Sequence, residues 1–135
     1  MTEPPSVEEV VRVAQFRAGL RRFLRRSERV ARSSGLTPQR YLLLLMIKGA
    51  PEGDEQSTVT ELADRLQLAQ STVTELVSRA EEVGLVEREQ SASDGRVAHL
   101  RLTAEGEKRL ERAFTDLAAE RRERREAFAN LDDAT

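Results

Sequence analysis

Residues 70–79 form a stretch of short polar side chains that holds the best candidates for binding chemistry in this sequence. On a helix, at 100° per residue, most of its polar groups point to one side, while Val73 and Val77 point to the other. Hydroxyls and amides can hydrogen-bond the edges of DNA bases, and short side chains let the helix backbone come close to a groove. The candidates for DNA contact on this helix are Gln70, Ser71, Thr72, Thr74, Glu75, Ser78 and Arg79.

A second group, Asp94 and Arg96, lies in the turn-rich segment that follows. An arginine at a loop tip can contact a phosphate or enter a minor groove, and Asp94 can hold that arginine or accept from the amides of the turn. Strand candidates flank the turn, because residues 85–89 are strand-like and residues 96–103 alternate apolar with polar. We therefore expect a β-hairpin with a polar, DNA-contacting tip.

Residues 58–84 must position the first group of candidates. Thr58 and Glu61 match a capping box at a helix start, and residues 67–69 match a tight turn. A second helix is predicted from about residue 70 to 83, without a capping side chain at Ala69. Its core-facing residues are expected to be Val73, Leu76, Val77, Ala80 and Val83. Two such helices followed by a hairpin indicate a winged helix-turn-helix.

The first long helix is predicted from the capping box at Ser6 and Glu9 to about Arg32. Apolar residues recur along it at intervals of three and four, as in packed helix pairs. Eight arginines lie between them, and three interpretations of that run stay open: a solvated face, phosphate contact, or contact with an acidic partner. Thr37 and Pro38 then begin a second helix that is apolar nearly all round, so we expect it to be buried.

The composition excludes several function classes. With 135 residues, no cysteine and one histidine, the chain offers no disulfide, no thiol nucleophile and no multi-histidine metal centre. It also lacks a glycine-rich phosphate loop, a long apolar run and a secretion signal. We expect a cytoplasmic protein that is not an enzyme and has no cofactor, metal or membrane partner. The net charge of −2 argues mildly against nucleic acid, since DNA-binding domains are commonly basic.

The order of elements and four motifs resemble the MarR family of bacterial transcription regulators over roughly residues 10–125. The motifs are LTPQRYLLLL, TVTELADRL, QSTVTELVSRAEEVGLVER and SDGRVAHLRLTAEG. The most specific piece is Asp94-Gly-Arg96 with the trailing Leu100-Arg-Leu102-Thr103, which is similar to the family's wing motif. Three positions depart from the family pattern: Glu75 where arginine is frequent, Ala69 where Ser or Asp caps the helix, and Gln67 in place of a turn glycine.

This resemblance implies a homodimer that binds double-stranded DNA at a pseudo-palindromic operator, as a repressor that a small aromatic or anionic effector releases. The implied dimer contacts are Val13, Phe16, Leu20, Phe23, Leu110, Phe114, Leu117 and Phe128. The implied effector pocket involves Arg12, Phe16, Arg40, Tyr41 and Leu45. A winged-helix module that binds protein rather than DNA is the alternative, supported by Glu75 and by the excess of acids over bases in residues 54–103.

The predicted fold class is mainly α with a small β-hairpin wing, a winged helix-turn-helix with long N- and C-terminal dimerisation helices. The DNA-binding domain is predicted to span residues 37–103, with its wing at about 85–103. Residues 6–36 and 104–135 form the dimerisation region, and residues 1–5 form a disordered tail.

Overall fold

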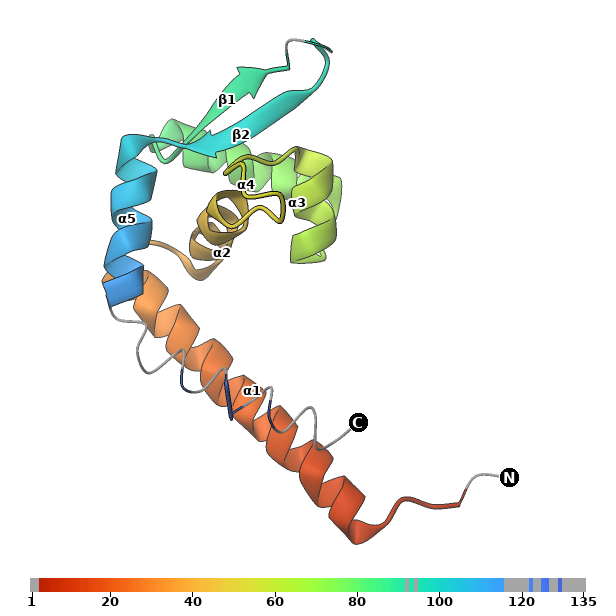
Figure 1. Ribbon diagram of the computed structural model, residues 1–135. Helices are drawn as coiled ribbons and strands as arrows, with labels where there is room; N and C mark the ends of the chain where they lie inside the picture. Colours follow the sequence, from red (N-terminus) through yellow and green to blue (C-terminus); the bar gives the residue numbers. More distant parts are fainter. Residues whose placement is uncertain are drawn as a thin grey trace. The chain divides into compact units, whose positions relative to one another are not determined.

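The computed structural model describes residues 3–91, 93 and 95–115, and the single positions 122, 125, 126 and 129. Within these residues the chain forms helices and one two-stranded antiparallel sheet (Figure 1). The elements are α1 (Val7–Ser33), α2 (Pro38–Lys48), α3 (Val59–Leu66), α4 (Gln70–Glu82), β1 (Val86–Gln90), β2 (Ala98–Leu102) and α5 (Ala104–Thr115). This order confirms the predicted fold class of a mainly helical chain with a β-hairpin.

The chain divides into two compact units. One comprises α1 up to Val30 together with the described positions from Phe114 onward, and the other comprises residues 31–113. The second unit therefore takes in α2, α3, α4, the hairpin and most of α5.

Helix α1 begins at the predicted capping box. The Ser6 amide donates to Glu9 Oε2 at 3.1 Å, and the Glu9 amide donates to Ser6 Oγ at 3.2 Å. Residues 3–5, which precede it, have no regular secondary structure and are exposed. Along the predicted dimer stripe, Val13 is 45% exposed, and Phe16, Leu20 and Phe23 are half-buried.

Helix α2 is the centre of the second unit, as its sequence predicts. Thr37 caps it, with Oγ1 accepting from the Arg40 amide at 3.2 Å. The helix packs against α3, α4 and β2, and α3 packs against α4 (Figure 1). The fully buried side chains of this core come from all four elements and include Tyr41, Leu43, Leu44, Ile47, Leu62, Val73, Val77 and Leu100.

The hairpin is fastened to the helices at its base. Strands β1 and β2 pair from Val86 with Leu102 to Gln90 with Ala98. Ser57, just before α3, adds a short bridge to β2: its amide donates to the Leu100 carbonyl at 3.2 Å, and the Leu100 amide donates back at 2.8 Å. The position of the wing is thus fixed by backbone hydrogen bonds to the segment that enters the helix-turn-helix.

The predicted core position of Val83 is wrong, because its side chain is 52% exposed. Helix α4 ends at Glu82, and Gly84 then adopts φ +77°, which turns the chain away from the helical register. Leu85, only 3% exposed, enters the core instead. The strands also differ from the prediction. Strand β1 is shifted by one residue, to Val86–Gln90 from the predicted 85–89, and β2 is shorter, Ala98–Leu102 in place of 96–103.

Helix α5 starts in close contact with the residues after α4. Thr103 Oγ1 donates to the Gly84 carbonyl at 2.6 Å and accepts from the Gly106 amide at 3.1 Å. A side chain at Gly106 would collide with the Leu85 carbonyl oxygen, so only glycine fits this approach. Lys48 also links α2 to α5, because its Nζ lies 3.0 Å from Glu107 Oε1.

Within the described residues, no helix is both long enough and apolar enough to cross a bilayer.

Candidate nucleic-acid interface

Helix α4 has one buried and one exposed side. Val73, Val77 and Ala80 are completely buried, which holds the helix against the core. On the other side, Ser78 is half-buried, and the remaining predicted contact residues are exposed: Gln70, Ser71, Thr72, Thr74, Glu75 and Arg79. The structure therefore brings all seven helix candidates together on one accessible polar surface.

The turn before α4 has a left-handed residue that is not glycine. Gln67 adopts φ 56° and ψ 47°, a conformation in which a side chain is disfavoured. Its side-chain amide donates to the Asp64 carbonyl at 2.5 Å, and the Leu68 amide donates to the Ala63 carbonyl at 3.0 Å. These bonds close the turn and set the direction in which α4 begins. Gln67 therefore adopts the left-handed conformation for which the family pattern has a glycine.

The N-terminus of α4 lacks a side-chain cap, as its sequence predicts. Ala69 has the extended conformation of an N-cap residue, with φ −64° and ψ 147°, but no side-chain hydrogen bond. The amides of the first helical turn are consequently not occupied by a capping oxygen. Free amides at a helix start, together with the helix dipole, suit an anionic group such as a phosphate.

Glu75 and Arg79 form an ion pair on the exposed side of α4. Arg79 Nη2 lies 2.6 Å from Glu75 Oε1, and both side chains are 63% exposed. The carboxylate that departs from the family pattern is therefore neutralised by a neighbour one turn away. The pair also engages the only arginine of this helix, which lowers the positive charge that α4 presents to solvent.

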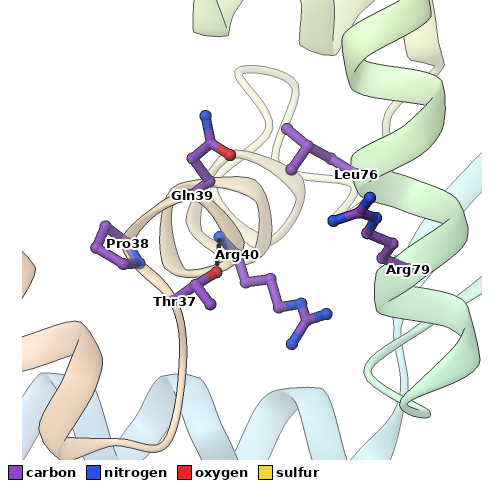
Figure 2. A pocket seen from close by; sticks show the side chains of 6 residues that line it. All are labelled: Thr37, Pro38, Gln39, Arg40, Leu76 and Arg79. Carbon is purple, nitrogen blue, oxygen red and sulfur yellow. Dashed lines mark hydrogen bonds between the residues drawn. The ribbon is translucent and has the colours of Figure 1, made fainter.

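A pocket of about 280 Å³ lies between the start of α2 and the middle of α4. Figure 2 shows Leu76 and Arg79 extending from α4 toward the first turn of α2, where Arg40 lies. A smaller pocket of about 120 Å³ adjoins it and is lined by Gln39, Thr72, Glu75, Leu76 and Arg79. Two guanidinium groups thus lie beside an opening next to the polar surface of α4.

The wing exposes Arg96 at the turn between the strands. The Ser91 amide donates to the Val97 carbonyl at 2.8 Å and continues the hairpin beyond the strands. Arg88 Nε, in the middle of β1, donates to Glu81 Oε1 of α4 at 2.8 Å, which joins the wing directly to α4. Asp94, the partner predicted for Arg96, lies outside the described residues.

The predicted effector residues fall into different parts of the chain. Tyr41 is 2% exposed inside the core, Leu45 is half-buried, and Arg40 lines the pocket described above. Arg12 and Phe16 belong to the other compact unit, where Arg12 Nε is buried without a hydrogen-bond partner. The structure therefore brings Arg40 together with Arg79, a combination that the sequence did not suggest.

The predicted dimer residues of the C-terminal part also differ in exposure. Leu110 is 3% exposed and so has little surface left for a partner, whereas Phe114 is 44% exposed. Leu117 and Phe128 lie outside the described residues.

Sequence reasoning missed four residues of the pocket. Thr37 and Pro38 were considered only as a helix start, Leu76 only as a core residue, and Gln39 was not singled out. The signal available was the Thr37-Pro38 cap, which shows that a helix begins there. What that helix start faces depends on its packing against α4, and no local pattern encodes it.

Comparison with known proteins identifies the fold. Residues 34–97 match the model of the MarR family. In its winged-helix part, the chain is similar to the MarR family. The match covers α2, the helix-turn-helix and β1, and it extends to the wing turn that carries Arg96.

Individual MarR-like relatives are similar over different shares of their length. The uncharacterized HTH-type transcriptional regulator YsmB of Bacillus subtilis (strain 168) is 34% identical over 73 residues, which is 54% of this chain and 50% of YsmB. The chain thus spans about half the length of this curated relative. AbsC, a MarR family regulator from Streptomyces coelicolor, superposes with a TM-score of 0.73 at 22% identity, over 96% of this chain and 84% of AbsC. Sco3205 from the same organism, solved in complex with DNA, superposes with a TM-score of 0.70 at 24% identity. The superposition covers 94% of this chain and 77% of Sco3205.

Proposed function

We propose that this MarR-like chain is a DNA-binding transcriptional regulator that reads its site with α4 and holds the adjacent backbone with Arg96. The observation that carries the proposal is the exposed polar surface of α4. Short side chains at Ser71, Thr72 and Thr74 leave the helix backbone accessible to a major groove. The completely buried Val73 and Val77 hold that surface rigidly to the core, as base readout requires.

The wing supports the same proposal from a second element. Arg96 is exposed beyond the paired strands, and the Arg88–Glu81 bond fixes the wing to α4. A cation held at a set distance from the reading helix can bind a phosphate or the minor groove beside the site. Sco3205, a structural relative, has been solved in complex with DNA. YsmB and AbsC are both described as transcriptional regulators, which supports the expectation that this chain is not an enzyme.

The proposal extends to the assembly and its control. A homodimer would present two copies of α4 to a pseudo-palindromic operator, with α1 residues such as Phe16 and Leu20 in the interface. Repression follows if the operator overlaps a promoter, and release follows if a small aromatic or anionic effector alters the spacing of the two helices. A cytoplasmic location belongs to this proposal, since bacterial operators lie there.

The effector site is proposed from two groups of residues. Arg12 and Phe16 are candidates on α1, with Arg40, Tyr41 and Leu45 on α2. The buried, unpartnered Nε of Arg12 is the feature that most favours an anionic ligand.

Selection of bound duplexes from random DNA tests the proposal. Enrichment of a two-fold symmetric sequence, bound by a dimer in sedimentation analysis, is the expected result. Binding should weaken steeply as salt rises, since phosphate contacts release counterions. If no duplex is bound at low salt, the chain is not a DNA-binding regulator.

A protein-binding winged helix is the second candidate. Its support is charge, because residues 34–113 contain fourteen acidic and ten basic residues. This candidate predicts no enrichment of any DNA sequence in the same selection.

A further inference from the structure

We propose that one side of α1 binds the phosphate backbone of DNA, in addition to the contacts made by α4 and the wing. The surface in question, here the arginine face, consists of Arg17, Arg21, Arg22, Arg25 and Arg29. The inference rests on the proposed function, because it assumes that DNA is the partner of this chain.

The arginine face is continuous along the helix. At 100° per residue its five members span about 140° of the circumference, opposite the apolar stripe that contains Phe16, Leu20 and Phe23. From residue 17 to residue 29 the face is about 18 Å long. All five side chains are exposed, whereas the three apolar ones are half-buried.

Acids on α1 compensate this charge only in part, because Glu28 is the one glutamate that falls within the arginine face. Across α1, Val7–Ser33, eight arginines face three glutamates, and two of those glutamates lie in the first turn at Glu8 and Glu9. Within the described part of the chain, none of the five arginines makes an ion pair or a side-chain hydrogen bond. Like charges at spacings of four, such as Arg17–Arg21 and Arg21–Arg25, repel each other and destabilise a helix. An external polyanion would relieve this repulsion.

The winged-helix part of the chain carries too little positive charge to account for strong binding to phosphates. Residues 34–113, which contain the winged helix, are net negative, with fourteen acids against ten bases. On α4 itself, the single arginine is engaged by Glu75. Phosphate affinity must therefore come largely from elsewhere, and α1 carries the largest excess of positive charge of any described helix.

The residue type suits binding to phosphate. All five members are arginine, whose planar guanidinium forms two parallel hydrogen bonds to a phosphate. A duplex offers about ten phosphate charges over the 18 Å that the face spans. Such contacts add affinity without reading sequence.

The salt dependence of DNA binding by the full-length chain tests the inference. The variant Arg21→Gln/Arg25→Gln removes two charges from the arginine face. Its matched control, Arg122→Gln/Arg125→Gln, removes two exposed charges elsewhere. Fluorescence anisotropy would follow binding to a selected duplex and to a random duplex, from about 50 to about 300 mM salt.

We expect the face variant to lose affinity for both duplexes equally. The slope of log K against log salt should become shallower by up to about 3.6 for a bound dimer, or about 0.9 for each of the four lost phosphate contacts, while the control keeps the wild-type slope. Thermal unfolding should show the variant at least as stable as the wild type, since a repulsive pair is removed. Retained folding makes a loss of binding attributable to the contacts themselves.

Three results would overturn the inference. The face variant could keep the wild-type slope, or both double variants could lose the same slope, which would reveal an effect of net charge alone. Alternatively, the face variant could lose binding to phosphatidylserine vesicles and not to DNA, which would assign the face to a membrane surface.

These results are separable from a failure of the proposed function. If the wild type selects a preferred sequence and the face variant keeps its slope, only the inference fails. If the wild type binds DNA without preference and the face variant loses slope, the inference holds and sequence-specific regulation fails. A wild type that binds no DNA overturns both.

Discussion

Arg79 Nη2 donates to Glu75 Oε1 at 2.6 Å, one helical turn apart on the exposed side of α4. The pair has two consequences for binding. It cancels a carboxylate that would repel the phosphates of a groove, and it engages the only cation of α4. If α4 binds DNA as proposed, its affinity depends on whether this pair stays closed when a duplex approaches.

Glu75→Gln is expected to raise DNA affinity about fivefold, because it removes a negative charge and frees Arg79 for a phosphate. The salt slope should steepen by about 1.8 for a bound dimer if Arg79 of each protomer gains one phosphate contact. Anisotropy with a selected duplex would measure both. Glu111→Gln, which removes an exposed charge on α5, serves as the control and should change little. If Glu75→Gln instead lowered the affinity only for duplexes with a cytosine at one particular position, Glu75 would accept a hydrogen bond from the amino group of that cytosine.

Arg96→Ala is expected to weaken binding to every sequence by roughly tenfold, because a wing cation contacts backbone or minor groove and not a particular base edge. Ser71→Ala or Ser78→Ala should instead change the preferred bases, which sequence selection would detect. Lys108→Gln is the control for the loss of one positive charge, because this exposed lysine lies on α5 and not on the wing. Unchanged affinity of Arg96→Ala would refute the wing assignment.

Gly106→Ala is expected to destabilise the fold by about 2 kcal/mol, although alanine normally favours a helix. The new Cβ would collide with the Leu85 carbonyl oxygen, and that oxygen already accepts from the Thr103 amide at 3.0 Å. Urea unfolding would measure the change. Gly95→Ala is the matched control, since no atom lies within 4 Å of its added Cβ, and it should be neutral. A stabilised Gly106→Ala would show that α5 does not need this close approach.

Ala69→Ser is expected to stabilise the protein by about 1 kcal/mol, because a serine hydroxyl at the N-cap can accept from an amide of the first turn of α4. Ala69→Val has no such oxygen and should not stabilise. The same serine would occupy amides proposed to meet a phosphate, so the gain in stability should come with a modest loss of DNA affinity. Equal stability of both variants would mean that the backbone conformation at Ala69 does not permit capping.

Lys48→Gln is expected to lower the free energy of unfolding by up to about 1 kcal/mol near neutral pH. Hydrogen bonds from Lys48 to Glu107, and next to Glu55, raise its pKa above the ordinary 10.5. A raised pKa stabilises the folded state fully below the unfolded value, and this contribution is lost as pH rises through the folded value.

Urea unfolding of the wild type and Lys48→Gln across pH would check this. Their difference should be constant from pH ~7 to ~9 and shrink above pH ~11. Lys108→Gln, which removes an exposed lysine of α5, should show no such trend. A difference independent of pH would mean that the ion pairs do not stabilise the fold.

Local features of this protein followed from its sequence. The capping boxes at Ser6 and Thr58 and the cap at Thr37 appear as predicted, because each involves residues three apart. The polar side of α4 was also predictable, since helical periodicity decides which residues share a face. The exposure of Val83 was not, because it depends on how Gly84 redirects the chain toward Leu85.

The sequence by itself thus determined the order of elements, the polar side of α4 and the hairpin, because caps, periodicity and turns act over a few residues. Only the tertiary structure decided which distant groups meet: Ser57 with Leu100, Arg88 with Glu81, and Arg40 beside Arg79. Each of these depends on the packing of α2 against α4 and the hairpin. Packing is a property of the whole unit, since a side chain's neighbours are set by every element around it.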